Sequence, residues 1–240
     1  MKKLIIVILC LLVLLSGCTP AITPTTTADP ETGCAAHADS DDNGSCDNCE
    51  ANLLVELNFY NINDLHGKIT DGDAQPGVDE LTTYLKKAQN TKENVILLSS
   101  GDMWQGSAES NMTGGLLTTD WMNYMGFAAM ALGNHEYDWG EEKIKANAQL
   151  AQFPFLAINI YNRDTNQQVE YCQSSVLIDK GEIQVGIIGA MGDCYSSISA
   201  DQVEDVYFKV GHELTSLVKA ESQALRQQGA DYIVHYPRWL

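Results

Sequence analysis

Basic residues are scarce in this 240-residue chain. Lysine and arginine together number 14, against 32 aspartates and glutamates, and the formal net charge is −18 at pH 7. Such an excess of negative charge argues against electrostatic binding of nucleic acid or of anionic lipid surfaces. We therefore expect no nucleic-acid polymer as a partner. A phosphate-bearing small molecule is still compatible with this charge if bound cations invert the local field.

Long hydrophobic runs are also missing. The longest apolar stretch, residues 4–15, is shorter than the roughly 20 residues that a membrane-spanning helix needs. It follows Lys2 and Lys3 and leads into Leu15-Ser16-Gly17-Cys18, an order that resembles a bacterial lipoprotein signal peptide with its lipobox. We expect residues 1–17 to be removed and the protein to be lipid-anchored through Cys18, outside the cytoplasm at a bacterial cell membrane. The alternative is an ordinary secretory signal in which Cys18 has no role.

The next segment has almost nothing to bury. Residues 18–33 are rich in threonine and contain three prolines, which disfavour a helix. This composition predicts an extended tether between the anchor and the folded body.

Residues 34–50 are rich in cysteine and aspartate and are compatible with two different metal sites. The pairs Cys34-x2-His37 and Cys46-x2-Cys49 have the spacing of tetrahedral zinc ligands. The same stretch matches an EF-hand calcium loop, in which oxygen ligands alternate around a glycine turn, although the flanking helices are missing. The calcium candidates are Asp39, Asp41, Asn43, Asp47 and Glu50. A third possibility is an acidic linker with a local disulfide.

The cysteine count gives a weak indication in favour of zinc. Of the seven cysteines, Cys10 leaves with the signal and Cys18 would carry the lipid, so an odd number is left. An odd number cannot pair fully in an oxidising compartment. A zinc site of three cysteines and one histidine, together with a Cys172–Cys194 disulfide, would use them all.

From residue 52 to residue 240 the sequence predicts an α/β domain. Hydrophobic runs bounded by Gly, Asp and Asn alternate with segments of helical periodicity. The expected strands are 53–62, 95–99, 128–132, 155–160, 175–178, 184–189 and 232–235. The expected helices are 78–88, 116–125, 141–150 and 213–228.

Possible metal ligands follow three of the expected strands. Asp64 and His66 follow the first strand, Asp102 follows the second, and Asn134 and His135 follow the third. Because ligands of α/β sheets gather at the carboxyl ends of strands, we expect these side chains to meet at one edge. Carboxylate and amide oxygens together with imidazole suit divalent ions such as zinc, manganese or iron.

These motifs occur together in a known family. Asn63-Asp64-Leu65-His66-Gly67, Gly101-Asp102 and Gly133-Asn134-His135-Glu136-Tyr137-Asp138, in this order, resemble the 5'-nucleotidase and 2',3'-cyclic nucleotide phosphodiesterase branch of the calcineurin-like metallophosphoesterases. The similarity extends from about residue 53 to residue 234. It implies a four-layer α/β/β/α sandwich, incomplete at the C-terminus, that hydrolyses a nucleotide or a related phosphoester.

The resemblance also implies a role for each site residue. Asp64 and His66 would bind a first divalent ion, Asp102 would bridge two ions, and Asn134 would bind the second. His135 would be the catalytic histidine, and Asp138 would orient it.

The chain departs from the family pattern near its end. The family has a Ser-His pair after the last strand, and alignment places Pro237-Arg238 there. Arginine carries no free lone pair for a cation, and His235 is expected on the opposite face of the strand. His212, at the start of a predicted helix, is expected to be solvated or to cap that helix. A Gly-His-x-His group of the family would fall beyond Leu240.

Two other functions are therefore compatible with the sequence. One is a truncated, non-catalytic fragment of such an enzyme that binds one ion. The other is a surface binding protein that acts through residues 34–50.

Overall fold

The computed structural model describes residues 34, 38–41, 45–49, 54–70, 77–181 and 183–238. The chain divides into two units, residues 1–54 and 55–240. The expected signal peptide and tether, and also His37, Asn43 and Glu50, lie outside the described residues. Within the described part of the chain, no helix has the length and apolar character needed to cross a membrane.

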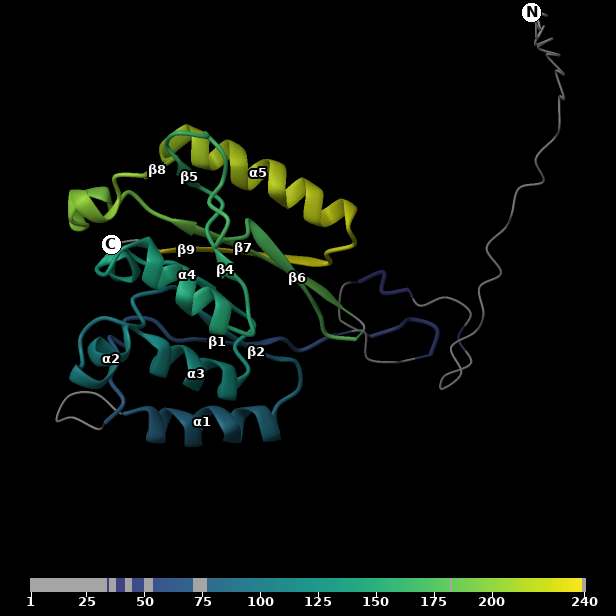
Figure 1. Cartoon of the computed structure of the whole chain (residues 1–240). Coiled ribbons are helices and arrows are strands. Elements are labelled where there is room, and N and C mark those ends of the chain that lie inside the picture. Colours follow the sequence, from purple (N-terminus) through teal and green to yellow (C-terminus); the bar gives the residue numbers. More distant parts are fainter. Residues whose placement is uncertain are drawn as a thin grey trace, which may run out of the picture. The chain divides into compact units, whose positions relative to one another are not determined.

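The first sheet of the larger unit is parallel and has the order β1-β2-β3-β4. Its strands are β1 (Asn58–Asn61), β2 (Val95–Ser99), β3 (Ala129–Ala131) and β4 (Phe155–Leu156). Helices α1 (Val78–Thr91), α3 (Leu116–Met125) and α4 (Glu141–Leu150) lie along one side of this sheet (Figure 1). The other side faces a second sheet. Strands covered on both faces are expected to be continuous apolar runs, and β2 has the sequence VILLS.

The second sheet contains β6 (Ser175–Asp179), β7 (Gln184–Met191) and β9 (Tyr232–Arg238). Strand β7 is antiparallel to β6 and parallel to β9. Helix α5 (Gly211–Gln227) precedes β9 in the chain and covers the outer face of this sheet (Figure 1). Gly186 allows this close packing, because a Cβ at that position would lie 2.9 Å from Leu225 Cδ1.

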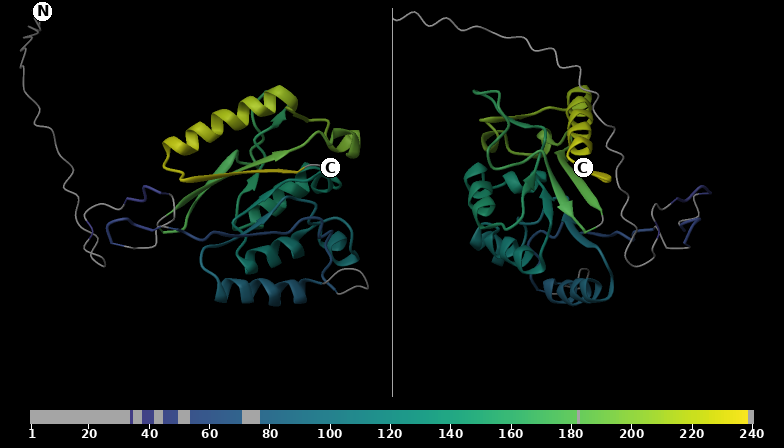
Figure 2. Two further views of the ribbon diagram at one scale, coloured as in Figure 1. Left: turned by 180° about the vertical axis from the view of Figure 1, so that it is seen from behind. Right: turned by 90° about the vertical axis from the view of Figure 1, so that its right-hand side faces the viewer.

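Side chains from both sheets interdigitate to form the central core. The fully buried members of this inter-sheet cluster are Ile96, Leu98, Ala129, Leu156, Val185 and Ile187. A separate cluster, which includes Leu97, packs the first sheet against its helices, and a third packs Ile188 against Leu214 and Leu225 of α5. The order of layers is thus helices, sheet, sheet, helix (Figure 2), which confirms the expected α/β/β/α sandwich.

The smaller elements were not predicted from the sequence. They are α2 (Ala108–Thr113), β5 (Ile160–Asn162), β8 (Val206–Phe208) and the 3-10 turns η1 (Asn134–Tyr137), η2 (Tyr195–Ser197) and η3 (Ala200–Gln202). The strand expected over 155–160 is in fact two short strands, because β5 leaves the first sheet and pairs with β8.

Strand β9 continues to Arg238, beyond the expected end at His235. Pro237 pairs with Ala190 of β7 in this ladder. Among the described residues β9 lies at the edge of its sheet, which is where a proline is tolerated within a strand.

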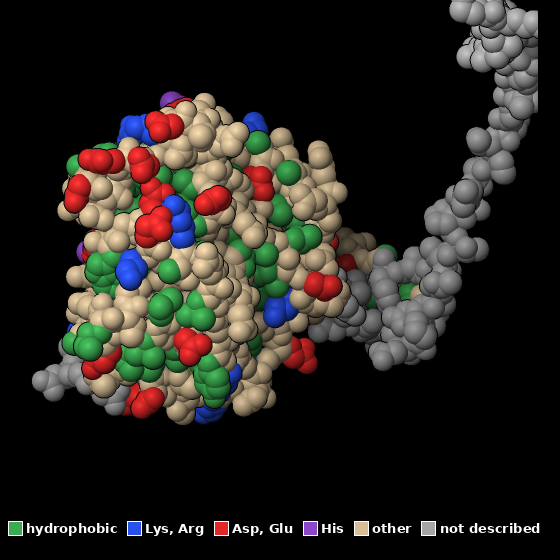
Figure 3. Space-filling model, in the orientation of Figure 1, with side chains coloured by type: hydrophobic (Ala, Val, Ile, Leu, Met, Phe, Trp, Pro, Cys, Tyr) green, Lys and Arg blue, Asp and Glu red, His purple; other side chains and the backbone are tan. Residues whose placement is uncertain are grey.

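The face of the molecule drawn in Figure 3 carries acidic and basic side chains that are interspersed with apolar ones. Acidic side chains do not form one continuous field on this face. On this face the acidic side chains are therefore separated from one another.

The inter-sheet cluster should contribute much of the stability. Leu98, which is 1% exposed, fills space between the sheets, whereas Leu117 on α3 is 40% exposed. We expect Leu98→Ala to lower the free energy of unfolding by about 2–5 kcal/mol, because it removes buried methyl groups and leaves a cavity. Leu117→Ala is the matched control and should change it by less than about 1 kcal/mol. Urea unfolding followed by circular dichroism measures both, and equal effects would contradict the assigned core.

Candidate functional site

The turns that follow β1 and β2 pair with each other beyond the ends of the strands. The backbone N–H groups of Asp64, His66 and Gly67 donate to the carbonyl oxygens of Gly101, Asp102 and Met103, at 3.1, 3.1 and 2.8 Å. This pairing continues the parallel register of the two strands into the loops. It holds the segments that carry Asp64, His66 and Asp102 side by side.

The backbone of these three candidate ligands is strained. Their φ angles are 54° at Asp64, 50° at His66 and 55° at Asp102. This left-handed region is uncommon for residues other than glycine and costs about 1–2 kcal/mol per residue. Such strain persists only where the surroundings impose it, and it concentrates at functional sites.

His66, Asp102 and His135 meet at the carboxyl edge of the first sheet. Each offers a ligand atom, and these atoms all lie within 4.8 Å of one another. The two imidazole rings are 5.0 Å apart between centroids, and Asp102 is 1% exposed. Asp64 lies on the same turn as His66, and its carboxylate accepts a hydrogen bond from the Asn63 amide.

The tautomer of His66 is fixed by the next loop. His66 Nδ1 lies 2.7 Å from the carbonyl oxygen of Gln105. Because a carbonyl oxygen only accepts hydrogen bonds, Nδ1 carries the proton, and Nε2 keeps a lone pair that can bind a cation.

The 3-10 turn η1 places Asn134 and His135 directly after β3. Asn134 is buried, and among the described residues its Oδ1 atom has no hydrogen-bond partner. A buried amide oxygen without a partner costs about 1–3 kcal/mol. A divalent ion would satisfy this atom, so the donor set fits a hard or borderline cation.

His135 is held from two directions. Its backbone N–H donates to Asp102 Oδ1 at 3.1 Å, and its ring Nδ1 donates to Asp138 Oδ2 at 2.7 Å. Burial lowers the pKa of His135, but the hydrogen bond to Asp138 and the charges of Asp138, Asp102 and Glu136 outweigh it. The pKa is therefore raised above its ordinary value, which favours the imidazolium form.

Glu136 has a role that the sequence analysis did not assign. It is fully buried, and its carboxylate accepts hydrogen bonds from the backbone N–H groups of Asp102, Met103 and Gly133, at 2.8, 2.8 and 2.7 Å. Burial and the charge of Asp102 raise the pKa of Glu136 to about 7, although the three N–H donors oppose this shift. Glu136 thus ties the loop after β3 to the loop after β2.

Two glycines permit this close approach. A Cβ on Gly133 would lie 2.2 Å from Asp102 Oδ1, and a Cβ on Gly101 would lie 2.3 Å from the Gly133 nitrogen. Gly101 also has a φ of +95°, which other residues rarely adopt. Any side chain at either position would push the two loops apart.

The second sheet contributes no ligand at its expected position. Pro237 and Arg238 occupy the end of β9, opposite Ala190 and Met191. His235 faces α5 and lines a cavity of about 470 Å³ together with His212, which agrees with the expected reversal of the face. His212 is exposed near the start of α5, as expected.

The remaining cysteines divide into two groups. Cys34, Cys46 and Cys49 lie together in the smaller unit, as do Asp39, Asp41 and Asp47. The disulfide expected between Cys172 and Cys194 is not formed among the described residues. Both side chains are buried in the core, where cysteine packs as a small apolar residue.

Comparison with known proteins gives consistent results. A family model described as calcineurin-like phosphoesterase matches residues 57–235. Protein UshA of Yersinia enterocolitica is 28% identical over 167 residues, which cover 67% of this chain and 30% of UshA. A 5'-nucleotidase of Rattus norvegicus is 35% identical over 149 residues, which cover 56% of this chain and 26% of that protein.

Solved structures share the fold. A 5'-nucleotidase precursor from Thermus thermophilus matches with a TM-score of 0.67 at 24% identity, over 76% of this chain and 37% of that one. The chain thus spans between about a quarter and a third of the length of the two curated relatives.

The three hydrogen bonds to Glu136 generate a prediction. In Glu136→Gln, one carboxylate oxygen becomes an amide NH2 that faces a backbone N–H donor. We expect a loss of about 1–3 kcal/mol in the free energy of unfolding, because a buried donor loses its acceptor. The affinity of the Glu136→Gln protein for divalent ions should also fall, because Glu136 holds the loop that carries Asp102. Glu142→Gln is the control, since Glu142 is exposed and pairs with Lys145 at the surface. Unfolding and calorimetric titration with Mn²⁺ measure both effects, and an unchanged Glu136→Gln protein would contradict this role.

Proposed function

Because the chain belongs to the calcineurin-like phosphoesterase family, we propose that it hydrolyses nucleotide phosphoesters, as a 5'-nucleotidase does, with two divalent ions. The observation that carries the proposal is the meeting of His66, Asp102 and His135 beside the unpartnered oxygen of Asn134. The names of the relatives support the nucleotide as the substrate.

We propose two ion positions at this edge, with the Asp102 carboxylate serving both. Asp64 and the free Nε2 of His66 would hold the first ion, and Asn134 Oδ1 would hold the second. Asp102 can serve both, because a carboxylate has two oxygens with several lone pairs. Zinc, manganese and iron suit this mixture of oxygen and nitrogen ligands. When bound, the ions supply positive charge that polarises the phosphoryl oxygens and acidifies the attacking water.

His135 is the proposed acid of the reaction. Asp138 holds the proton on Nδ1, so the remaining proton of the imidazolium form is carried by Nε2. This proton can be given to the leaving alkoxide oxygen, and the positive ring stabilises the charge that develops on the phosphoryl group.

A second candidate function is the binding of one ion without hydrolysis. The observation that favours it is that Pro237 and Arg238 end β9 where the family has its Ser-His pair, because arginine is not a metal ligand. In that case the ion would bind to Asp64, His66 and Asp102, and phosphoesters would not be cleaved.

Hydrolysis of AMP and of p-nitrophenyl phosphate in the presence of Mn²⁺ separates the two candidates. We expect turnover that a chelator removes, that Asp102→Ala abolishes and that His135→Ala lowers by roughly 10²- to 10⁴-fold. Asp120→Asn and His212→Ala are controls, since both residues are exposed outside the site, and they should leave kcat/KM unchanged. Mn²⁺ binding without any turnover would favour the second candidate, and turnover that survives Asp102→Ala would contradict the proposed site.

We also propose that the protein is anchored outside the cytoplasm by a lipid on Cys18. The support is the lysine-led apolar stretch that ends in Leu15-Ser16-Gly17-Cys18, followed by the proline-containing tether. Such an anchor holds the folded body at the membrane without crossing it.

Metabolic labelling with an alkyne fatty acid in a bacterial host tests the anchor. The wild-type chain and Cys10→Ala should carry the label, whereas Cys18→Ala should not. Label that persists in Cys18→Ala, or that never appears in the wild type, would contradict lipidation at Cys18.

A further inference from the structure

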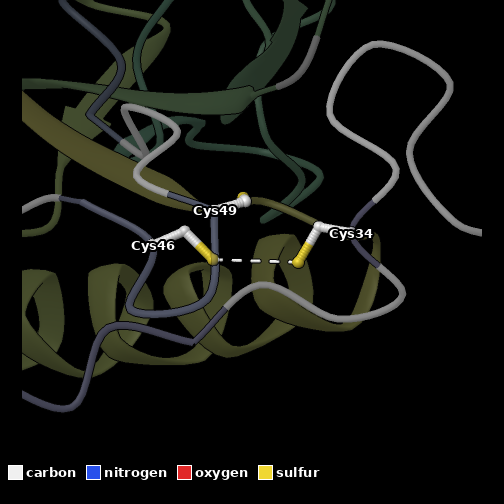
Figure 4. A group of neighbouring side chains, drawn as sticks. All are labelled: Cys34, Cys46 and Cys49. Carbon is white, nitrogen blue, oxygen red and sulfur yellow. Dashed lines mark hydrogen bonds between the residues drawn. The ribbon is translucent and has the colours of Figure 1, made fainter.

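Three cysteines of the smaller unit point their sulfur atoms toward a shared region. The sulfur atoms of Cys34, Cys46 and Cys49 all lie within 4.8 Å of one another. Figure 4 shows the Cys34 and Cys46 sulfurs facing each other, with Cys49 beside them. From this arrangement we infer that Cys34, Cys46 and Cys49 bind a zinc ion through their three thiolates, a ligand set that shares no residue with the phosphoesterase centre.

The distance between the sulfurs matches a metal site better than a disulfide. Tetrahedral zinc with Zn–S bonds of about 2.3 Å places its sulfur ligands about 3.8 Å apart. Cys34 Sγ and Cys46 Sγ are 3.9 Å apart. A disulfide would bring them to about 2.05 Å and would use only two of the three sulfurs.

The backbone of the segment is folded so that the thiols converge. Within Cys46-x2-Cys49, the Cys49 N–H donates to the Cys46 carbonyl at 3.3 Å, which closes a turn and brings both cysteines together. The Asp47 N–H donates to the Ala38 carbonyl at 2.7 Å, and the Ser40 N–H donates to Asp47 Oδ2 at 3.0 Å. These bonds join the Cys46–Cys49 turn to the chain that follows Cys34.

This segment has no hydrophobic core of its own. Between residues 34 and 49 the apolar side chains are only those of alanine and cysteine, yet Cys46 is 1% exposed. So short a segment needs a cross-link or a metal to hold a fixed fold. Zinc would supply that link, with the three thiols each releasing one proton to solvent as the ion binds.

The sulfur ligands decide which metal is proposed. Thiolates prefer zinc over hard cations, whereas calcium takes oxygen ligands almost exclusively. Asp39, Asp41 and Asp47 form a neighbouring acidic group, but a group of acidic side chains alone does not define a site. His37, the expected fourth ligand, lies outside the described residues, and the proposal uses the three thiolates alone.

Cobalt substitution in the full chain tests the site. Co²⁺ bound to thiolates absorbs in the near ultraviolet through charge transfer, whereas Co²⁺ on oxygen and imidazole ligands does not. We expect this band in the wild type and in Asp102→Asn, and its loss in Cys46→Ser and Cys49→Ser. Zinc should displace it, and the wild type should hold one more equivalent of tightly bound zinc than either cysteine variant. Ser45→Ala, a change in the same loop without loss of a thiol, should keep both signals.

The thiolate site and the phosphoesterase site can be tested separately with two variants. Cys49→Ser should keep metal-dependent hydrolysis of p-nitrophenyl phosphate, which also shows that the larger unit is folded, while Asp102→Asn should lose hydrolysis but keep the thiolate band. A Cys34–Cys46 disulfide found by alkylation and mass spectrometry of freshly purified protein would overturn the proposal. So would a thiolate band that survives both cysteine substitutions, or calcium binding by the segment with no zinc bound.

Discussion

The site depends on the backbone pairing between loops that follow neighbouring parallel strands. β1, β2 and β3 end at one edge of the first sheet, and hydrogen bonds between the loops continue beyond the strands. Left-handed backbone at three candidate ligands, at about 1–2 kcal/mol each, is tolerable only because these bonds and the sheets beneath impose it. The Glu136 carboxylate also joins two of these loops, because it accepts hydrogen bonds from three backbone N–H groups. These bonds hold the candidate ligands in place at the edge of the sheet.

Much of the fold could be predicted from the sequence, because each larger helix or strand has a clear hydrophobic pattern within its own residues. A strand such as β2 is an uninterrupted apolar run, and α1 has clear helical periodicity. The candidate ligand positions could also be predicted from the sequence, since polar residues with metal-binding side chains follow three such apolar runs. The small β5–β8 pair was not predicted, because its pairing joins segments that are distant in the sequence and each strand is only three residues long. Glu136 was missed for a different reason: an acidic residue in an acidic chain is expected to be solvated, and only the three-dimensional structure shows the N–H groups around it.

The two metal sites that we propose use different types of ligand. The phosphoesterase centre combines carboxylate, amide and imidazole ligands, and its buried Asp102 and Asn134 fit divalent ions that can also attract a phosphate ester. The proposed zinc site gathers the thiolates of Cys34, Cys46 and Cys49, in a segment whose apolar side chains are only alanine and cysteine. In a chain with a net charge of −18, bound cations explain how an anionic substrate could approach one place while the rest of the surface repels it.

The central claim is that Asn134 Oδ1 and Asp102 share a divalent ion. Anomalous X-ray diffraction from crystals of the full chain grown with Mn²⁺ tests this most directly. We expect an anomalous peak within coordination distance of Asn134 Oδ1 and an Asp102 oxygen, with a second peak beside His66 Nε2 and Asp64. It would be contradicted by a fully ordered site in which Asn134 Oδ1 binds only water or protein while Mn²⁺ saturates the solution.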